Sequence, residues 1–292
     1  MILITGATGN LGKATMNSLL NNGISANNIA VLVRNEFKSE EFKSKGIQVR
    51  IGDYNDIDAL KSAFADVDKL LLISSSSDIK KRFEQHQNVI DAAKETGVSH
   101  IVYTSFDMKD LRGSDMAADV QYHADTSYYL KQKGVTYTLL NNTLYADLIP
   151  VISGNNILTE GITIPAGNGK TPFLPITEMA EAITVVLTNT GHENKEYVIA
   201  AETALSFAEI AEIISQVTGT SVAYNQTDKT SYIKQLVQVG VSQKDAAYLS
   251  RFADAIANGE FDTNHSDIGQ LLGRSSMPLK DFLRSKYGHN KA

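Results

Sequence analysis

The chain opens on a short apolar run that stops at a glycine-rich turn, and this opening restricts the folds open to the rest. Residues 1–12 read Met-Ile-Leu-Ile-Thr-Gly-Ala-Thr-Gly-Asn-Leu-Gly. Gly6 permits a sharp turn from strand to helix, Gly9 leaves bare backbone for a close ligand, and Gly12 lets the next helix approach the strand. Free amides at the start of that helix face an anion. The opening predicts a bound dinucleotide pyrophosphate; the alternative is a glycine-rich turn that binds nothing.

Apolar runs alternate with helix-length spacers through the first half of the chain. Parallel strands are covered on both faces and therefore read as continuous apolar runs. Six such runs lie at residues 1–4, 29–34, 48–53, 69–74, 100–105 and 136–140. Helical patterns lie between them at 13–21, 38–45, 56–65, 82–96 and 118–133. This alternation predicts an α/β fold built on a doubly wound parallel sheet of the Rossmann type.

The character of the sequence changes after Tyr145. Four of the five prolines, at positions 150, 165, 172 and 175, mark irregular loops between domains or around a cleft. The remainder reads mostly as short helices, with a helix near 178–188 and a short strand at 197–200. We therefore expect a Rossmann domain over residues 1–145 and a smaller, mostly helical domain over 146–292. Segments near 176–201 are the ones expected to return and pack on the first domain.

Composition argues against several classes of protein. The net charge of −6, with no block of lysine or arginine, argues against a nucleic-acid partner. No apolar stretch is long enough to span a membrane. The absence of cysteine excludes disulfides and thiolate ligands, and the six histidines show no paired spacing, so we expect no metal site. Because the chain begins directly on a strand without a leader, we expect a cytoplasmic location.

The end of the second apolar run indicates which nicotinamide cofactor is bound. An NAD site usually places Asp or Glu there for the ribose 2′-hydroxyl, whereas arginine suits a 2′-phosphate. This chain has Arg34, with Lys38 four residues later. A guanidinium both pairs with phosphate and stacks on adenine. The sequence therefore predicts NADP rather than NAD, the alternative being that Arg34 is a solvated charge at a strand end.

Polar residues after the third and fourth runs are candidates for the rest of the cofactor. Asp53 is placed to accept from the adenine amino group, with Tyr54 beside it, or alternatively to cap the helix that starts near Asp56. The run Ser74, Ser75 and Ser76 is predicted to line the ribose and diphosphate, because ligands of such sheets bind at the carboxyl ends of strands. The alternative is a set of polar residues at a solvated edge.

The tyrosine–lysine pair that ordinary short-chain dehydrogenases use for proton transfer is not evident at its usual place. Tyr129 and Lys133 have the right spacing, but Lys133 ends its helical stretch, whereas a working pair lies near the helix start. Counting back along the helix places those two positions near Asp119 and His123, and neither has the required side chain.

Six blocks of sequence together resemble one known family. They are Ile-Thr-Gly-Ala-Thr-Gly-Asn-Leu-Gly (4–12), Val-Arg-Asn (33–35), Gly-Asp-Tyr (52–54), Leu-Leu-Leu-Ile-Ser-Ser-Ser (70–76), Tyr-Thr-Ser (103–105) and Gly-His-Glu-Asn-Lys-Glu-Tyr (191–197). The chain resembles the NmrA-like branch of the atypical short-chain dehydrogenases, and within it the bacterial NADPH:quinone oxidoreductases and triphenylmethane dye reductases. The resemblance implies cofactor contacts by Gly6, Thr8, Gly9, Asn10, Leu11, Arg34, Ser74, Ser75, Ser76, Tyr103, Thr104 and Ser105.

The same resemblance implies NADPH-dependent hydride transfer to quinones or similar electron-poor aromatic acceptors. A non-catalytic NADP-binding redox sensor of the NmrA type is the alternative, and a homodimer is left open. Family members often have Arg-Asn after the sixth strand; Asn142 matches this pattern as a cofactor contact, and Asn141 departs from it. Many also have Thr-Glu where this chain has Thr126 and Ser127. The departures concern the substrate pocket more than the cofactor site.

The implied substrate pocket lies in an apolar cleft walled by Phe106, Leu144, Tyr145 and Phe173. His123 or Tyr145 is placed to hydrogen-bond the acceptor oxygen, the alternative being a structural role for each. Hydride delivery to a quinone yields a resonance-stabilised hydroquinone anion, which needs a general acid less than an alkoxide does. Proximity of the two rings in a closed cleft supplies much of the acceleration.

Overall fold

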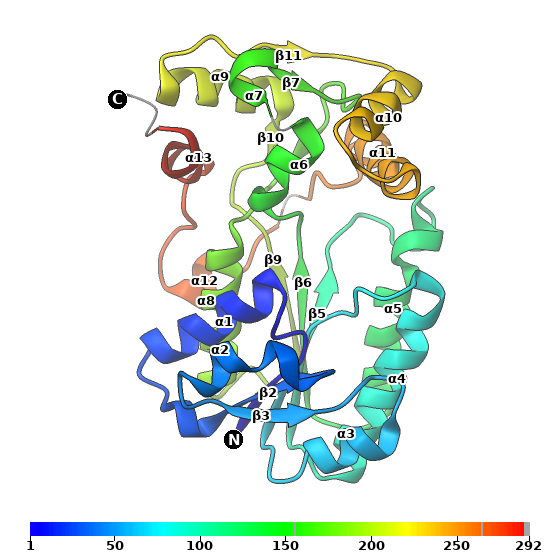
Figure 1. The fold of residues 1–292 in the computed structure, drawn as a ribbon, viewed down its shortest axis with the longest axis vertical. Coiled ribbons are helices and arrows are strands. Elements are labelled where there is room, and N and C mark those ends of the chain that lie inside the picture. Colours follow the sequence, from blue (N-terminus) through cyan, green and yellow to red (C-terminus); the bar gives the residue numbers. More distant parts are fainter. Residues whose placement is uncertain (155, 264, 289–292) are drawn as a thin grey trace.

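A seven-stranded parallel sheet forms the centre of the protein, as the computed structural model of residues 1–154, 156–263 and 265–288 describes it. The strand order is β3-β2-β1-β4-β5-β6-β9, and every neighbouring pair runs parallel (Figure 1). The strands are β1 Ile2–Ile4, β2 Ile29–Val33, β3 Gln48–Ile51, β4 Lys69–Leu72, β5 His100–Phe106, β6 Tyr137–Asn142 and β9 Lys195–Ile199. The doubly wound fold predicted from the apolar runs is confirmed, and strand order reverses between β1 and β4, where ligands of such sheets bind.

Helices cover both faces of the sheet (Figure 1). One face carries α1 Asn10–Asn21, α2 Glu40–Lys43, α8 Ile176–Thr188 and α12 Ile268–Leu272, and the other carries α3 Ile57–Ala63, α4 Ile79–Glu95 and α5 Ala117–Gln132. Each face has its own cluster of buried apolar side chains. Because α8, β9 and α12 come from the second half of the chain, both halves build the sheet layer.

The remaining elements form a mostly helical layer above the carboxyl ends of the strands, which we term the cap (Figure 1). Its helices are α6 Ile149–Ser153, α7 Ile157–Glu160, α9 Phe207–Thr218, α10 Lys229–Gln238, α11 Gln243–Ala257 and α13 Leu279–Tyr287. Two small pairs join them: parallel β7 Ile162–Thr163 with β11 Tyr224–Asn225, and antiparallel β8 Lys170–Thr171 with β10 Leu205–Ser206. The cap core includes Met116 and Val120 beside and within α5, so the cap packs directly on the first half of the chain.

The loop between β4 and α4 differs from the sequence prediction. β4 ends at Leu72, and α4 begins at Ile79 rather than near Arg82. The cause is Asp78, whose carboxylate accepts from the amide of Lys80 at 3.1 Å and caps the helix. Arg82 is therefore in the first turn of α4, within reach of the loop that follows β4.

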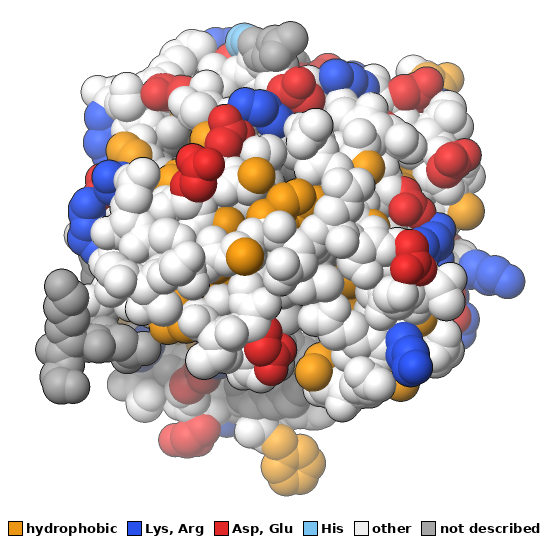
Figure 2. Space-filling view, turned by 90° about the horizontal axis from the view of Figure 1, so that it is seen from above, with side chains coloured by type: hydrophobic (Ala, Val, Ile, Leu, Met, Phe, Trp, Pro, Cys, Tyr) orange, Lys and Arg blue, Asp and Glu red, His pale blue; other side chains and the backbone are white. Residues whose placement is uncertain are grey.

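No helix within the described ranges is both long and apolar enough to cross a membrane. Seen from above, the face of the cap carries acidic and basic side chains interspersed with one another (Figure 2).

Candidate active site

The glycine-rich turn between β1 and α1 has the geometry that its sequence predicts. Gly6 adopts a φ of +61°, and a Cβ there would lie 3.1 Å from Cβ of Ile73. A Cβ on Gly12 would fall 2.5 Å from the carbonyl oxygen of Gly6, a distance that real side chains do not occupy. Gly9 is the N-cap of α1 and supplies no side-chain cap, so the first amides of the helix stay open to a ligand.

The other predicted residues of this turn lie where a ligand reaches them, with one exception. Thr8, Gly9 and Asn10 are exposed. Leu11 is 5% exposed and packs in the core below α1, so it positions the helix and offers its backbone rather than its side chain. The turn is a cradle of backbone amides, which suits a pyrophosphate.

Hydrogen bonds fix the switch point between β1 and β4. The buried hydroxyl of Thr5 donates to the carbonyl of Leu71 at 3.0 Å and accepts from the amide of Ile73 at 3.0 Å. Tyr54 donates its hydroxyl to the carbonyl of Ile73 at 3.2 Å, and burial raises the pKa of Tyr54 well above its usual value. Tyr54, predicted to lie beside the adenine, therefore has its hydroxyl engaged by backbone.

The residues predicted at the adenosine end follow β2 and β3. The side chain of Arg34 is exposed and makes no hydrogen bond or ion pair with any described residue. The side chain of Lys38 lies outside the described part of the structure. Asp53 accepts from the amide of Asn55 at 2.8 Å, and the cap of α3 is Asp56, not Asp53. The alternative that Asp53 caps this helix is thus wrong, and its second carboxylate oxygen is left for a ligand.

The serine run after β4 is held by neighbouring elements. The amide of Ser74 donates to the hydroxyl of Thr104 at 3.0 Å. The hydroxyl of Thr104, a predicted cofactor contact, is therefore engaged within the protein. The hydroxyl of Ser75 donates to Oε1 of Gln85 at 2.7 Å, whereas Ser76 is exposed. Of the three serines, Ser76 and Ser74 keep the freer hydroxyls.

A buried histidine that the sequence analysis did not single out anchors this run. Nε2 of His86 accepts from the amide of Ser75 at 2.9 Å. Because the hydroxyl of Thr126 donates to the carbonyl of Tyr122 at 2.7 Å, Nδ1 of His86 donates to Thr126 at 2.9 Å. Burial lowers the pKa of His86 to about 3, and the nearby Arg82 charge acts in the same direction, so the ring is neutral.

Tyr103 and His123 meet beneath the crevice. The hydroxyl of Tyr103 lies 3.0 Å from Nδ1 of His123, and both side chains are buried. The His123 ring lies between Tyr122, at 4.2 Å between ring centres, and Phe106, stacked at 5.5 Å. Burial lowers the pKa of His123 well below its usual value. His123, predicted as a catalytic candidate, is therefore a neutral ring with one nitrogen already engaged.

The end of β6 carries a buried amide without a partner. Asn142 is 2% exposed, and within the described residues neither its amide oxygen nor its nitrogen meets hydrogen-bond geometry. Tyr145 lies near enough for this amide to affect its pKa, but burial dominates and raises that pKa to about 12. Buried amides are nearly always paired, and the Tyr145 side chain is the polar group nearby that a small shift would bring to Asn142. Ser105, at the end of β5, instead lies 3.2 Å from the hydroxyl of Ser127.

Three of the four residues predicted to wall the substrate pocket gather at this edge. Phe106, Leu144 and Tyr145 end or follow β5 and β6, and Phe106 meets Phe261 edge to face at 5.8 Å. Phe173 is different: it is 1% exposed and packs edge to face on Phe207 at 5.8 Å, inside the cap core. The structure places Phe173 behind the pocket wall.

An ion pair ties the cap to α5 beside the pocket. Nη2 of Arg251, in α11, donates to Oδ1 of Asp119 at 2.8 Å, and Nε donates to the other oxygen. Asp119 is 6% exposed. The same helix places Phe252 against Phe106 at 6.4 Å, edge to face. Asp119, one of the two positions where a proton-transfer pair was sought, thus anchors the cap.

Tyr129 and Lys133 have a structural role. The hydroxyl of Tyr129 donates to Oδ2 of Asp91 at 2.8 Å, and Nζ of Lys133 pairs with Oδ1 at 2.6 Å. These contacts join the end of α5 to α4, away from the glycine turn (Figure 1). Their spacing does not make them the proton-transfer pair.

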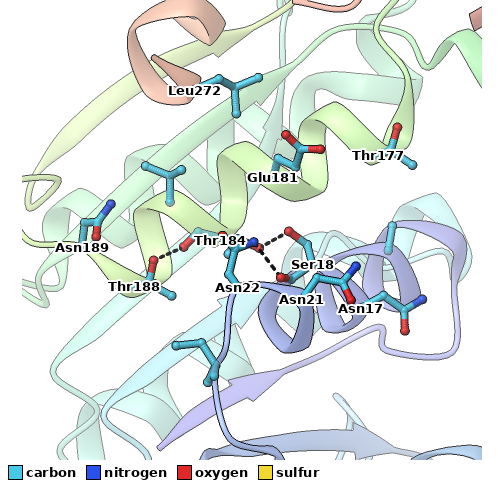
Figure 3. A pocket seen from close by; sticks show the side chains of 13 residues that line it. Asn17, Ser18, Asn21, Asn22, Thr177, Glu181, Thr184, Thr188, Asn189 and Leu272 are labelled. Atoms are coloured by element: carbon cyan, nitrogen blue, oxygen red, sulfur yellow. Dashed lines mark hydrogen bonds between the residues drawn. The ribbon is translucent and has the colours of Figure 1, made fainter. Parts of the chain in front are cut away.

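A polar groove of about 830 Å³ lies elsewhere, between α1 and α8 (Figure 3). Amide and hydroxyl side chains line it, and Thr184 contacts Ser18 across the two helices at 2.8 Å. None of the predicted site residues borders this groove. Among the described residues there is also no cluster of three side chains able to hold a metal ion.

The sheet order, the glycine turn and the cap together define a Rossmann-type α/β protein whose cap lies at the carboxyl ends of the strands. The chain belongs to the NmrA-like family, whose sequence model matches residues 1–283. Over 291 residues it is 33% identical to quinone oxidoreductase 2 of Escherichia coli (strain K12), which covers 99% of this chain and 100% of that protein. The family resemblance seen in the sequence is confirmed.

Two solved structures of relatives share the whole fold. The NADPH-dependent quinone oxidoreductase of Escherichia coli, complexed with NADPH, superposes with a TM-score of 0.89 at 32% identity and covers 98% of this chain and 100% of that chain. The triphenylmethane reductase of Citrobacter sp., complexed with NADP(H), gives a TM-score of 0.90 at 34% identity with the same coverage.

Proposed function

We propose that the protein is an NADPH-dependent oxidoreductase that transfers hydride to quinones or similarly electron-poor aromatic acceptors. The observation that carries the proposal is the turn from Gly6 to Gly12: its open amides fit a pyrophosphate, and Gly12 leaves no room for a Cβ where the helix meets the turn. The exposed, unpaired guanidinium of Arg34 fits the 2′-phosphate that distinguishes NADPH from NADH. The full-length similarity to NADPH-dependent reductases supports the same conclusion.

The residues of the crevice have distinct parts in this reaction. When bound, NADPH supplies the hydride. The open amides of the turn hold its pyrophosphate, and Asn142 takes a polar group of the cofactor or acceptor with its unpartnered amide. Phe106 and the aromatic face of α11 exclude water above the reacting rings. The proposal includes the other predicted cofactor contacts and a cytoplasmic location.

The test is consumption of NADPH by purified protein in the presence of menadione, a small quinone, with NADH in parallel. We expect turnover with NADPH well above turnover with NADH. A cationic triphenylmethane dye serves as a second acceptor. If calorimetry detects NADPH binding but neither acceptor is reduced, the non-catalytic sensor is the correct alternative. If neither coenzyme binds, both alternatives fail.

A further inference from the structure

Tyr122 in α5 is a residue that neither the sequence motifs nor the proposed mechanism above uses. Its ring packs at 4.2 Å from the His123 ring, and the side chain is 7% exposed. Its hydroxyl lies at the carboxyl end of β4, 3.5 Å from the hydroxyl of Ser74. Tyr122 thus lies between the serine run predicted to line the ribose and the aromatic wall of the pocket.

A cation from the neighbouring helix contacts this hydroxyl. Nη1 of Arg82 donates to the Tyr122 oxygen at 2.8 Å, and the guanidinium carbon lies 5.2 Å from the ring centre. Nε of Arg82 donates to the carbonyl of Ser77 at 2.9 Å, which fixes the guanidinium plane. Within the described residues Arg82 pairs with no carboxylate, and the phenol oxygen of Tyr122 accepts its shortest side-chain hydrogen bond.

The hydrogen bonds around Tyr122 involve its oxygen more than its proton. A phenol accepts through its oxygen and has one proton to donate. Arg82 and, more weakly, Ser74 approach the oxygen as donors. Apart from the Ser74 hydroxyl at 3.5 Å, the described residues offer the phenol proton no acceptor within hydrogen-bond distance, so the proton stays available to a ligand. The Tyr145 and Tyr248 side chains lie nearby, and their pKa values are both raised to about 12, chiefly by burial and partly by Tyr122.

We propose that Tyr122 donates the proton that an acceptor oxygen takes up during quinone reduction, and that Arg82 positions it and stabilises its phenolate. The inference rests on the proposed function. It assigns the missing tyrosine–cation pair to two helices: the cation comes from α4, 40 residues earlier in the chain, rather than from the next turn of α5. A guanidinium that donates to the phenol oxygen makes a charge-assisted hydrogen bond once the proton has moved to the acceptor.

Quinone reduction combines a hydride transfer with a proton transfer. The quinone gains a hydride, with its electron pair, from the dihydronicotinamide and is reduced, while the nicotinamide is oxidised. As negative charge grows on the acceptor oxygen, the O–H bond of Tyr122 breaks and a new O–H bond forms on the hydroquinone. The phenolate beside Arg82 then takes a proton from water, which restores Tyr122.

Two acceptors separate this role from a structural one. A quinone needs both hydride and proton, whereas a cationic triphenylmethane dye takes hydride on carbon and becomes neutral without a proton. For Tyr122→Phe we expect kcat/KM for menadione to fall about 10- to 100-fold relative to kcat/KM for the dye. Arg82→Met should lower the same ratio, and Arg82→Lys should restore part of it. Tyr128→Phe, at an exposed position of the same helix, is the matched control.

A binding measurement tests the hydrogen bond without turnover. Chromone is a bicyclic aromatic ligand that presents one carbonyl oxygen, and naphthalene has the same shape without it. With NADP⁺ present, calorimetry should show that Tyr122→Phe weakens chromone binding by roughly 2- to 10-fold, as one hydrogen bond predicts, and leaves naphthalene binding the same. Unchanged chromone binding would overturn the inference.

The kinetic outcomes distinguish this inference from the proposed function. If wild-type protein reduces menadione and Tyr122→Phe loses quinone and dye reduction by the same factor, the proton-donor role is wrong and the reductase remains. If wild-type protein reduces no quinone at all, both the proton-donor role of Tyr122 and the proposed quinone reductase function are wrong. A selective loss with menadione, combined with weaker chromone binding, supports the assignment.

Discussion

At the carboxyl edge of the sheet, two histidine rings hold their neighbours as neutral hydrogen-bonding groups. His86 accepts from the amide of Ser75 and donates to Thr126, and His123 meets the hydroxyl of Tyr103. In each case burial is the main cause of a lowered pKa. Protonating His86 would replace the acceptor at Nε2 with a donor facing the Ser75 amide. The shape of the serine run therefore depends on His86 staying neutral.

The first prediction concerns the pH dependence of folding. The pKa of His86 is about 3 in the folded protein and about 6.5 in the unfolded chain. As pH falls from 6.5 towards 3, the unfolded chain binds a proton that folded His86 does not, so the free energy of unfolding decreases by up to about 1.4 kcal/mol per pH unit. His86→Gln should flatten the dependence of the urea midpoint between pH 7 and 5. An unchanged slope in this variant would reject the role for His86.

The second prediction concerns Arg34 and coenzyme preference. Its guanidinium has no partner among the described residues, so its charge is available to a 2′-phosphate. A hydrogen bond to a charged group contributes about 1.5 to 3 kcal/mol, so Arg34→Asp should weaken NADPH binding by about 10- to 100-fold or more. NADH lacks that phosphate and should lose little. Calorimetry with both coenzymes checks this, with Arg34→Lys as the charge-preserving control. Equal losses for the two coenzymes would show that Arg34 does not select NADPH.

Sequence could predict the part of the site that depends on local chain geometry. Gly6 and Gly12 are required by the turn itself, and Arg34 follows from its place at the end of a strand. The contact of Arg82 with Tyr122 could not be predicted, because it joins residues 40 positions apart on separate helices. The helical pattern predicts a start near Arg82, whereas α4 begins at Ile79, so Arg82 lies in the first turn and reaches Tyr122.

At the scale of elements, α11 is the part of the cap most directly joined to the crevice. Its residues Arg251 and Phe252 contact Asp119 and Phe106 on the sheet side. Asp119 is buried while the Arg251 side chain is about one-third exposed, so solvent screens the pair in part. The contact fixes the position of α11 over the pocket and thus the space left for an acceptor.

The third prediction follows from the difference in burial between Asp119 and Arg251. Arg251→Met leaves a buried carboxylate without its partner, which should lower the free energy of unfolding by about 1 to 3 kcal/mol. Asp119→Asn in the same chain should recover part of that loss, because the uncompensated charge is gone. Urea unfolding of the two single variants and the double variant gives the coupling. Strict additivity of the two single effects would mean that the pair contributes nothing to stability.

The helices and strands of the sheet layer follow closely from the apolar pattern of the sequence. The exception is the loop between β4 and α4, whose limits the pattern does not predict. The six predicted apolar runs became β1 to β6; most are buried on both faces of the sheet, whereas β3, at the edge, is exposed or half-buried. The predicted run 69–74 was too long, since β4 ends at Leu72 and the serines lie beyond it. Side-chain packing in the cap could not be predicted: Phe173 faces Phe207 rather than the pocket, which only the cap's tertiary arrangement decides.

At the scale of the whole molecule, the chain passes between sheet and cap more than once. It leaves the sheet after β6, returns with α8 and β9, forms more of the cap, and returns again with α12 (Figure 1). α8 packs on α1, and β9 pairs with β6 over five residues. The predicted boundary at residue 145 therefore marks where the chain first enters the cap, while residues 1–145 lack three elements of the sheet layer.

The last prediction follows from this interleaving. Because the second half of the chain completes the sheet on which the cofactor turn rests, sheet and cap should unfold in one transition, and NADPH should shift that transition as a unit. At about 100 times its dissociation constant a ligand stabilises the folded state by about 2.7 kcal/mol. For a chain of this size that raises Tm by roughly 4 to 5 °C. Calorimetric scans with and without NADPH, followed in parallel by tyrosine fluorescence, measure the shift. Two separate transitions, only one of them moved by NADPH, would show instead that the cap folds independently and that the two halves are joined only through the crevice.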